Sequence, residues 1–403
     1  MRQGSESALY LPDVSVPTES QRRDEPSLLL PCMVTSAQTL ILINHAPLLP
    51  LIMRDLGITP AQAGLLSTVT FLGGGLLAIP VGQLTDWLGA RWMMAGSLAI
   101  LLLSTLGMAV APGYGTLLAV RLLSGVGVCA SFIAASHYAN AHWSGPRNAL
   151  AQGLLGGCMQ LGIGTAIFTL PFLAVHVGWR RALALCAVPL GLALGLWLGW
   201  SRATPPRRGT VPMRSVFADP ASWRLGLVNG ATFGLTVVLG TWVAVYFVEE
   251  FGLALTLAGM FGAQTALLGM VGRPIGGLLV ARGVVGARAL IRWMLAGSAL
   301  ALLLLAWPGR PVWAAVSAVI LVGITASLSY PGMLVLVSHV RPDATGAVLG
   351  VVSTVGSLVV ILGAPAIGAL FSASGDFSLP FALLALLPAA AVWATAGLPR
   401  DRG

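Results

Sequence analysis

The 403-residue chain contains no lysine, so all 22 of its basic residues are arginine. A Walker A phosphate-binding loop requires a lysine, and its absence argues against direct ATP drive within this chain. A lysine Schiff base is excluded for the same reason. Charged residues make up only 9% of the chain and hydrophobic residues 57%, with a mean hydropathy of +0.88. This composition excludes an ordinary soluble globular protein.

Cysteine and membrane-embedded acid are also scarce. The four cysteines (Cys32, Cys129, Cys158 and Cys186) lie in apolar stretches without a CxxC pair, so we expect packing roles and no disulfide or metal framework. No Asp or Glu falls in the middle of an apolar stretch, which disfavours cation antiport. Since no nucleophile–base pair is visible either, we expect a protein that is not an enzyme and needs no cofactor.

The apolar residues occur in blocks of about 20, each long enough to cross a hydrocarbon core about 30 Å thick. They predict an all-α membrane protein with twelve transmembrane helices in two six-helix bundles. The predicted spans are residues 28–53, 61–84, 92–111, 116–138, 149–175, 182–200, 223–248, 257–281, 289–307, 312–336, 346–372 and 378–396.

The longest polar interruption divides these spans into six and six. We predict a tail at 1–27, a first bundle at 28–200, a linker at 201–222, a second bundle at 223–397 and a tail at 398–403. Sixteen arginines fall on the linker side of the spans, and only Arg54, Arg180, Arg181 and Arg310 fall on the other. We expect the protein to lie in the inner (plasma) membrane of the cell. The positive-inside rule then places both termini in the cytoplasm. The excess of positive charge is explained by the orientation of the chain in the membrane. The expected partner is therefore the lipid bilayer, and we expect no nucleic-acid partner.

The two halves carry an internal repeat with an offset of 195 residues. Ala63-Gly64, Gly82 and Leu84 reappear as Ala258-Gly259, Gly277 and Leu279. The copies differ at two charged positions, because Asp86 corresponds to Ala281 and Ala78 corresponds to Arg273. A duplicated membrane chain of this kind is typical of a transporter, with its substrate site at mid-membrane between the halves.

The stretch Gly82-x-Leu84-Thr85-Asp86-x-x-Gly89-x-Arg91 resembles the loop signature of the major facilitator superfamily, with alanine at position 90 where a basic residue is usual. Arg121, Gly125 and Gly127 resemble that superfamily's second signature. The resemblance implies that Asp86, Arg91, Gly82 and Gly89 form a latch that closes the cytoplasmic side in one conformation. A solvated loop with a topological role is the alternative.

The run Gly272-Arg273-Pro274-Ile275-Gly276-Gly277 resembles the nitrate/nitrite porter branch, in which paired arginines of spans two and eight clamp the anion. Span five is a loose match to that branch's glycine-rich signature, with Gln160 in place of an asparagine. Ala78 stands where the span-two arginine is expected. One cationic anchor instead of two argues for a different, organic anion.

Arg273 is the strongest candidate for a substrate-binding residue. It lies well inside span eight without an acid in the same helix, and an unpaired arginine in hydrocarbon costs at least about 2.5–3.5 kcal/mol. Its planar fork suits a carboxylate, nitrate or phosphate oxygen pair. A structural arginine bound to backbone carbonyls is the alternative. Arg121, in span four, either lines the cavity as a second cation or binds carbonyls in the same way.

Polar and aromatic residues complete the candidate site. Asn44 and His45 lie in span one, where His45 can take a proton near neutral pH or be satisfied by a neighbouring carbonyl. Trp242, Tyr246 and Tyr330 are candidate aromatic walls, with simple packing as the alternative. Glu249 and Glu250 end span seven, where we expect solvated side chains.

Together these residues predict a secondary transporter that moves a small anion by alternating access, acting as a monomer, with a proton as one candidate coupling ion. Efflux of a hydrophobic or neutral compound is the alternative transport function. A membrane sensor that binds without carrying is a third possibility.

Overall fold

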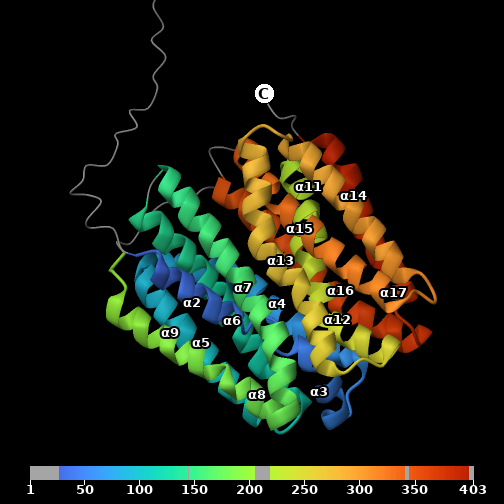
Figure 1. Ribbon diagram of the computed structural model, residues 1–403. Helices are drawn as coiled ribbons and strands as arrows, with labels where there is room; N and C mark the ends of the chain where they lie inside the picture. Colours follow the sequence, from blue (N-terminus) through green and yellow to red (C-terminus); the bar gives the residue numbers. More distant parts are fainter. Residues whose placement is uncertain (1–26, 144, 205–217, 341–344, 399–403) are drawn as a thin grey trace, which may run out of the picture.

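The computed structural model describes residues 27–143, 145–204, 218–340 and 345–398, which form helices and, within these ranges, no β-strand. Figure 1 shows the helices of the first half (blue to green) packed beside those of the second half (yellow to red). The first half comprises α2 (Leu29–Thr39), α3 (Leu49–Leu56), α4 (Pro60–Leu88), α5 (Ala90–Val110), α6 (Tyr114–His142), α7 (Gly145–Val177), α8 (Trp179–Leu185) and α9 (Ala187–Trp200). The second half comprises α11 (Pro220–Asn229), α12 (Leu235–Phe251), α13 (Leu255–Ala281), α14 (Ala287–Ala306), α15 (Val312–Val340), α16 (Thr345–Ser374) and α17 (Ser378–Ala394).

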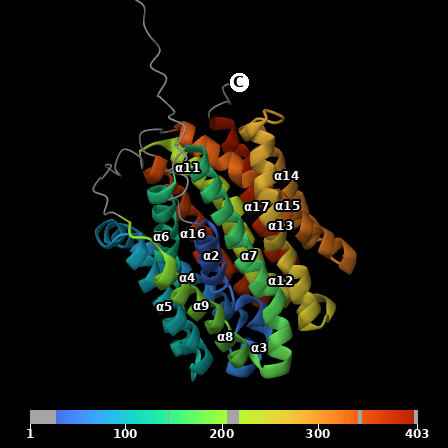
Figure 2. The ribbon, with the colours of Figure 1, turned by 60° about the vertical axis from the view of Figure 1, so that its left-hand side comes forward.

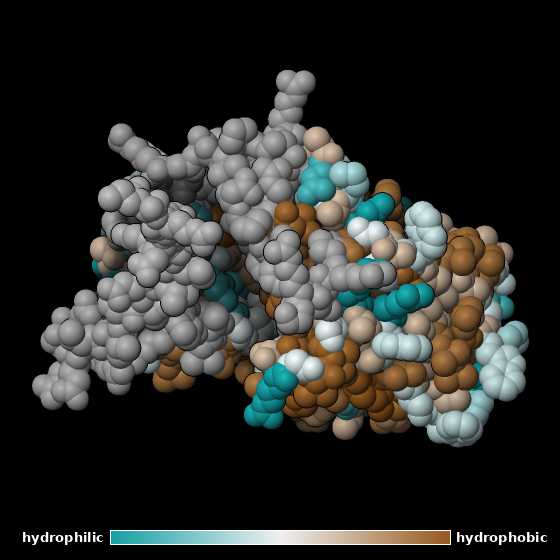
Figure 3. Space-filling view, turned by 90° about the horizontal axis from the view of Figure 1, so that it is seen from above, coloured by the Kyte–Doolittle hydropathy of each residue, from teal (hydrophilic) through white to brown (hydrophobic). Residues whose placement is uncertain are grey.

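The described residues contain 10 helical segments long and apolar enough to cross a membrane, counting α8–α9 and α11–α12 as one segment each. The two remaining predicted spans are α4, with 29 residues, and a broken span formed by α2, a short 3₁₀ turn and α3. The predicted twelve-span helical fold is therefore confirmed. Most of the predicted linker and both tails lie outside the described residues. Many large apolar side chains are exposed on the helices, as contact with lipid requires, and Figure 3 shows brown apolar side chains from above.

The first span of each half is irregular. Span one leaves the α-helix at Thr39 and resumes through the 3₁₀ turn Ala46–Leu48, where Pro47 removes a backbone donor. Span seven contains a π-helical turn, Gly230–Gly234, between α11 and α12. Irregular backbone inside a membrane requires protein partners for its polar groups, and it often marks a functional region.

The repeated Ala-Gly pairs explain how the halves meet at one end. We call the membrane side at which α4 and α13 begin the far end, and the side at Trp200 and Pro220 the linker end. A methyl carbon at Gly64 would lie 2.5 Å from the carbonyl oxygen of Ala364 in α16. The corresponding carbon at Gly259, on α13, would lie 2.4 Å from the ring of Pro171 in α7. Both copies of the repeat thus place a glycine where helices of opposite halves touch.

We predict that Gly64→Ala pushes α4 and α16 apart at the far end, because the added carbon meets backbone and cannot be avoided by a side-chain rotation. Overpacking of this kind costs about 1–3 kcal/mol. Thermal unfolding in detergent and spin-label distances between the far ends of α4 and α16 measure the effect. The control is Gly75→Ala on the same helix, where nothing lies within 4 Å of the added carbon. Equal behaviour of the two variants would contradict the proposed contact.

Candidate functional site

A small cavity lies between the two halves. It has a volume of about 20 Å³, which suffices for one or two waters. Among the described residues, Arg273 is the one charged residue that lines it. The lining residues come from the break in span one and from α7, α12, α13, α15 and the π-helical turn: Ile43, Gln160, Ile163, Ile167, Thr232, Phe233, Thr236, Val237, Thr265, Ala266, Arg273, Ala326, Ser327 and Tyr330.

The Arg273 guanidinium is only partly satisfied by the protein. Its Nη1 donates a hydrogen bond to the carbonyl oxygen of Gly156 in α7, at 3.2 Å. One face of the guanidinium lies over the Tyr330 ring, with the central carbon 4.1 Å from the ring centroid, in a cation–π contact. The Nε–H has no partner, and no carboxylate of the described residues forms an ion pair with Arg273. The site therefore holds a positive charge with a free donor.

Glycines bring the surrounding helices close enough to build this site. Gly269, Gly272 and Gly276 lie along one side of α13, at the i, i+3 and i+7 positions of a helix. An added methyl carbon would lie 2.4 Å from Gln160 at the first, 2.8 Å from Ser327 at the second and 2.3 Å from the backbone of α15 at the third. Figure 2 shows α7 beside α13 from a second direction. Such contacts hold helices together in lipid, where no hydrophobic force drives their association.

Of the candidate residues, the structure thus brings together Arg273 of α13, Gln160 of α7 and Tyr330 of α15. It adds Thr232, Phe233 and Thr236 from span seven, which the sequence analysis did not propose. The two glycines that bound the π-helical turn, Gly230 and Gly234, are the signal that marks this segment in the sequence.

Arg121 has a different environment. Its side chain is fully buried away from the cavity and donates to the carbonyl oxygens of Ile41 (3.1 Å), Leu42 (2.8 Å) and Leu66 (3.4 Å). It also donates to Oδ1 of Asn44, at 3.2 Å. These acceptors include carbonyls that the break in span one releases from helical bonding. Arg121 and Asn44 therefore stabilise the broken span, and neither lines the cavity.

His45 follows the same break and is also fully buried. Its Nε2 lies 2.9 Å from the hydroxyl of Ser67 in α4, and that hydroxyl lies 3.1 Å from the hydroxyl of Thr241 in α12. The partner is thus a hydroxyl instead of the carbonyl considered above. The two bonds connect the first half of the protein to the second, outside the cavity lining.

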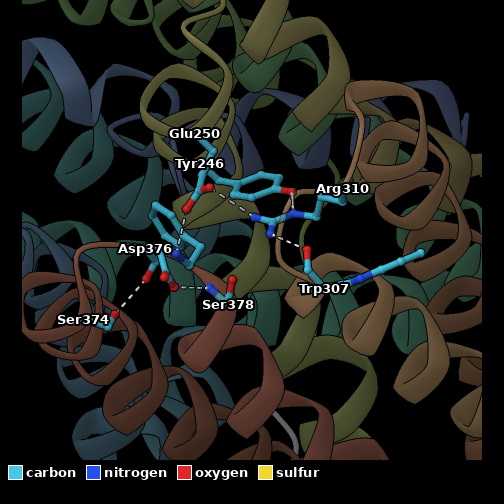
Figure 4. A network of polar contacts seen from close by, with 8 residues as sticks. Tyr246, Glu250, Trp307, Arg310, Ser374, Asp376 and Ser378 are labelled. Atoms are coloured by element: carbon cyan, nitrogen blue, oxygen red, sulfur yellow. Dashed lines mark hydrogen bonds and ion pairs between the residues drawn. The ribbon is translucent and has the colours of Figure 1, made fainter.

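Trp242 and Tyr246 pack inside the second half instead of lining the cavity. Trp242 donates from Nε1 to the carbonyl oxygen of Ala364, at 2.9 Å. Tyr246 lies at the far end, where its hydroxyl accepts a hydrogen bond from Nε of Arg310. Figure 4 shows this network and its continuation through Glu250.

Glu250 is not solvated as expected, because it joins two loops of the second half. Its carboxylate pairs with Nη2 of Arg310 at 3.5 Å and accepts a hydrogen bond from the backbone of Phe377 at 2.7 Å. The expectation failed because Arg310, from the loop before α15, is brought to Glu250 only by the tertiary fold. This network fixes the far end of the second half.

Comparison with known proteins places this helical architecture in a family. The family model described as Major Facilitator Superfamily matches residues 32–364. The chain belongs to this superfamily. Its members are transporters, so the chain is a multi-pass membrane transporter and not an enzyme, as the sequence predicted.

Among curated relatives, the nitrite extrusion protein of Bacillus subtilis is 24% identical over 90% of this chain and 91% of its own length. The probable nitrate/nitrite transporter NarK2 of Mycobacterium tuberculosis is 26% identical over 76% of this chain and 78% of its own. The probable nitrate transporter NarT of Staphylococcus haemolyticus is 27% identical, but the match spans only 58% of this chain and 61% of that protein.

A solved structure shows the same fold at the level of the whole chain. It is that of a bacterial homolog of the human lysosomal transporter Spinster, in an inward-facing and occupied conformation. The TM-score is 0.75 with 16% sequence identity, over 94% of this chain and 97% of the other. This likeness concerns the superfamily fold alone.

The superfamily's loop signature lies between α4 and α5 at the linker end. Gly89 is the one residue between these helices and has φ of 80°, and a methyl carbon there would lie 2.8 Å from the carbonyl oxygen of Thr204. Arg91 donates from Nη2 to the carbonyl oxygen of Leu198, at 2.9 Å, near the negative end of α9. The side chain of Asp86 lies outside the described residues, and Gly82 borders open space. The latch therefore stays a prediction.

We predict that Arg121→Lys destabilises the protein, because an ammonium cannot reach the carbonyls of Ile41, Leu42 and Leu66 together. Each buried acceptor left unsatisfied costs about 1–3 kcal/mol. A lower thermal unfolding midpoint in detergent is the expected result, with the exposed Arg181→Lys as the matched control. An unchanged midpoint together with loss of anion binding would instead assign Arg121 to the substrate.

Proposed function

We propose that this chain carries a small inorganic oxyanion of the nitrate and nitrite class across the membrane by alternating access. The anion binds at Arg273, between the two halves. The observation that carries the proposal is the partner-free Nε–H of a guanidinium that is the one charge on the cavity wall. Gln160, Ser327 and Tyr330 supply neutral polar groups around it.

Charge balance supports an anion over a neutral cargo. An arginine in the hydrocarbon region is costly unless a partner offsets its charge. Here one carbonyl and one aromatic face offset part of that charge, and no carboxylate of the described residues contributes. A monovalent anion on the Nε edge completes the neutralisation through charge-assisted hydrogen bonds. A hydrophobic or neutral compound would leave the charge uncompensated.

The size of the cavity and the names of the relatives favour an inorganic anion, contrary to the organic anion expected from Ala78. The cavity of about 20 Å³ admits few atoms, and Tyr330 closes one face of the guanidinium. Three relatives are named as nitrate or nitrite transporters or extrusion proteins. The missing span-two arginine then means that one cation and neutral donors hold the anion, instead of a pair of arginines.

The arginine distribution supports the orientation. Sixteen arginines lie on the linker side of the predicted spans and four on the other, so the linker end faces the cytoplasm and the protein lies in a plasma membrane. Both termini are then cytoplasmic, and the far end, with its closed glycine contacts, faces outward. Residues 28–200 and 223–397 form the two bundles that rock about the site.

We predict that Arg273→Ala abolishes the thermal shift that nitrate produces in the purified transporter. Hydrogen bonds to charged groups contribute about 1.5–3 kcal/mol, so the dissociation constant rises by about 10–100-fold or more. Uptake of labelled nitrate into proteoliposomes falls in parallel. Arg292→Ala, an exposed arginine of the same half, is the control and keeps both. Binding that survives Arg273→Ala would refute the proposed site.

Competition between anions tests the proposed substrate class. Nitrate and nitrite should displace each other, because both are small, flat and singly charged and fit one guanidinium edge. Sulfate and phosphate should compete poorly, since their second charge finds no further cation on the cavity wall. Benzoate should not compete because the cavity is too small. Strong inhibition of nitrate uptake by benzoate would instead favour an organic anion as the substrate.

A further inference from the structure

A second polar cluster lies along span one, outside the cavity, and its hydrogen bonds are incomplete. Four polar side chains of the span have buried atoms without partners: Thr35 Oγ1, both amide atoms of Gln38, Asn44 Nδ2 and His45 Nδ1. All four residues are at most 2% exposed. Since an unsatisfied buried polar group costs about 1–3 kcal/mol, native proteins place water molecules at such atoms. Span one thus has buried polar atoms that can bind polar ligands inside the first half.

His45 is the titratable member of this cluster, and Ser67 links it to Thr241 of the second half. The Thr241 hydroxyl donates to the carbonyl oxygen of Val237 at 2.8 Å, so it accepts the hydrogen bond from Ser67. Ser67 has then used its only proton, and Nε2 of His45 must donate to it. Nδ1 is left with a free lone pair in a buried polar environment. This nitrogen is a place where the protein can take up a proton.

The neighbours of His45 oppose that proton while the far end is closed. Arg121 of α6 is the charged group whose field reaches the imidazole. Ser67 of α4 and Thr241 of α12 are neutral, and Cys186 lies beside Asn44. None of these groups is a carboxylate. A proton on His45 therefore adds a second positive charge to a buried site, which is unfavourable unless water or an anion offsets it.

We propose that His45 is the proton-binding site that couples anion transport to the proton gradient, a role that rests on the function proposed above. Opening of the far end breaks the Ser67–Thr241 contact, admits water to His45 and allows its protonation. The far end closes again when the bound anion offsets the added charge, so the proton and the anion cross together. The imidazole releases the proton, without any covalent step, after the anion has left.

Proton movement measured together with nitrate movement tests this inference. Nitrate is the probe because its conjugate acid is too strong to carry protons through the lipid. Wild-type proteoliposomes that contain a fluorescent pH dye, with the membrane potential clamped, should acidify inside when nitrate is added outside. His45→Gln, which keeps a donor for Ser67, should abolish this acidification. His176→Gln should acidify like the wild type, because His176 is exposed at the far end of α7.

The outcomes separate the two proposals. Nitrate uptake by the wild type without acidification overturns the role of His45, and so does unchanged acidification in His45→Gln. If His45→Gln does not fold, the wild-type measurement still decides whether protons move, and Ser67→Ala is the second variant. It removes the Nε2 partner but keeps the imidazole, so acidification should persist. Absence of any nitrate binding or uptake in the wild type, measured by thermal shift and tracer, would overturn the anion function itself.

Discussion

The structure depends on how an apolar helical bundle accommodates a buried guanidinium without a carboxylate. Arginine cannot lose its proton inside a protein, so its charge must be balanced by oxygen atoms or aromatic faces. Arg121 finds three carbonyls and an amide oxygen, and its side chain is completely enclosed. Arg273 finds one carbonyl and one ring, its Nε–H has no partner, and the residue lines a cavity. This difference is the basis on which we propose Arg273, and not Arg121, as the binding residue.

Both arginines depend on departures from regular helix. The break after Thr39 supplies two of the three carbonyls that bind Arg121, those of Ile41 and Leu42, and without that break these oxygens would be bonded within the helix. In the second half the corresponding span contains the π-helical turn Gly230–Gly234, which presents Thr232 and Phe233 to the cavity. Phe233 in turn meets Phe71 of α4, with the ring centroids 6.1 Å apart. The irregular segments of spans one and seven thus shape the region between the halves.

Sequence reasoning reached the fold because its signals are local. Span length, the arginine asymmetry and the repeat need no knowledge of neighbours, and an arginine in span eight without an acid is visible in the letters alone. The roles of Arg121, Trp242 and Tyr246 were not accessible in this way, because each depends on which side of its helix faces which neighbour. Arg121 needed the break in span one, and Tyr246 needed Arg310 from a distant loop. Charge and spacing in the sequence identify these residues as candidates. Only their packing in the structure distinguishes a binding role from a structural one.

The two copies of the repeat match at some positions and differ at others. Gly64 and its equivalent Gly259 provide matching contacts across the interface, as two similar bundles need if they close against each other at the far end. Ala78 and its equivalent Arg273 differ, and within the described part of the chain only the second half contributes a charge to the cavity. That charge also bonds to Gly156 of the first half, and the same side chain therefore touches both bundles. Under the proposed function, an anion at Arg273 would act on a contact between the bundles and so link occupancy of the site to their relative position.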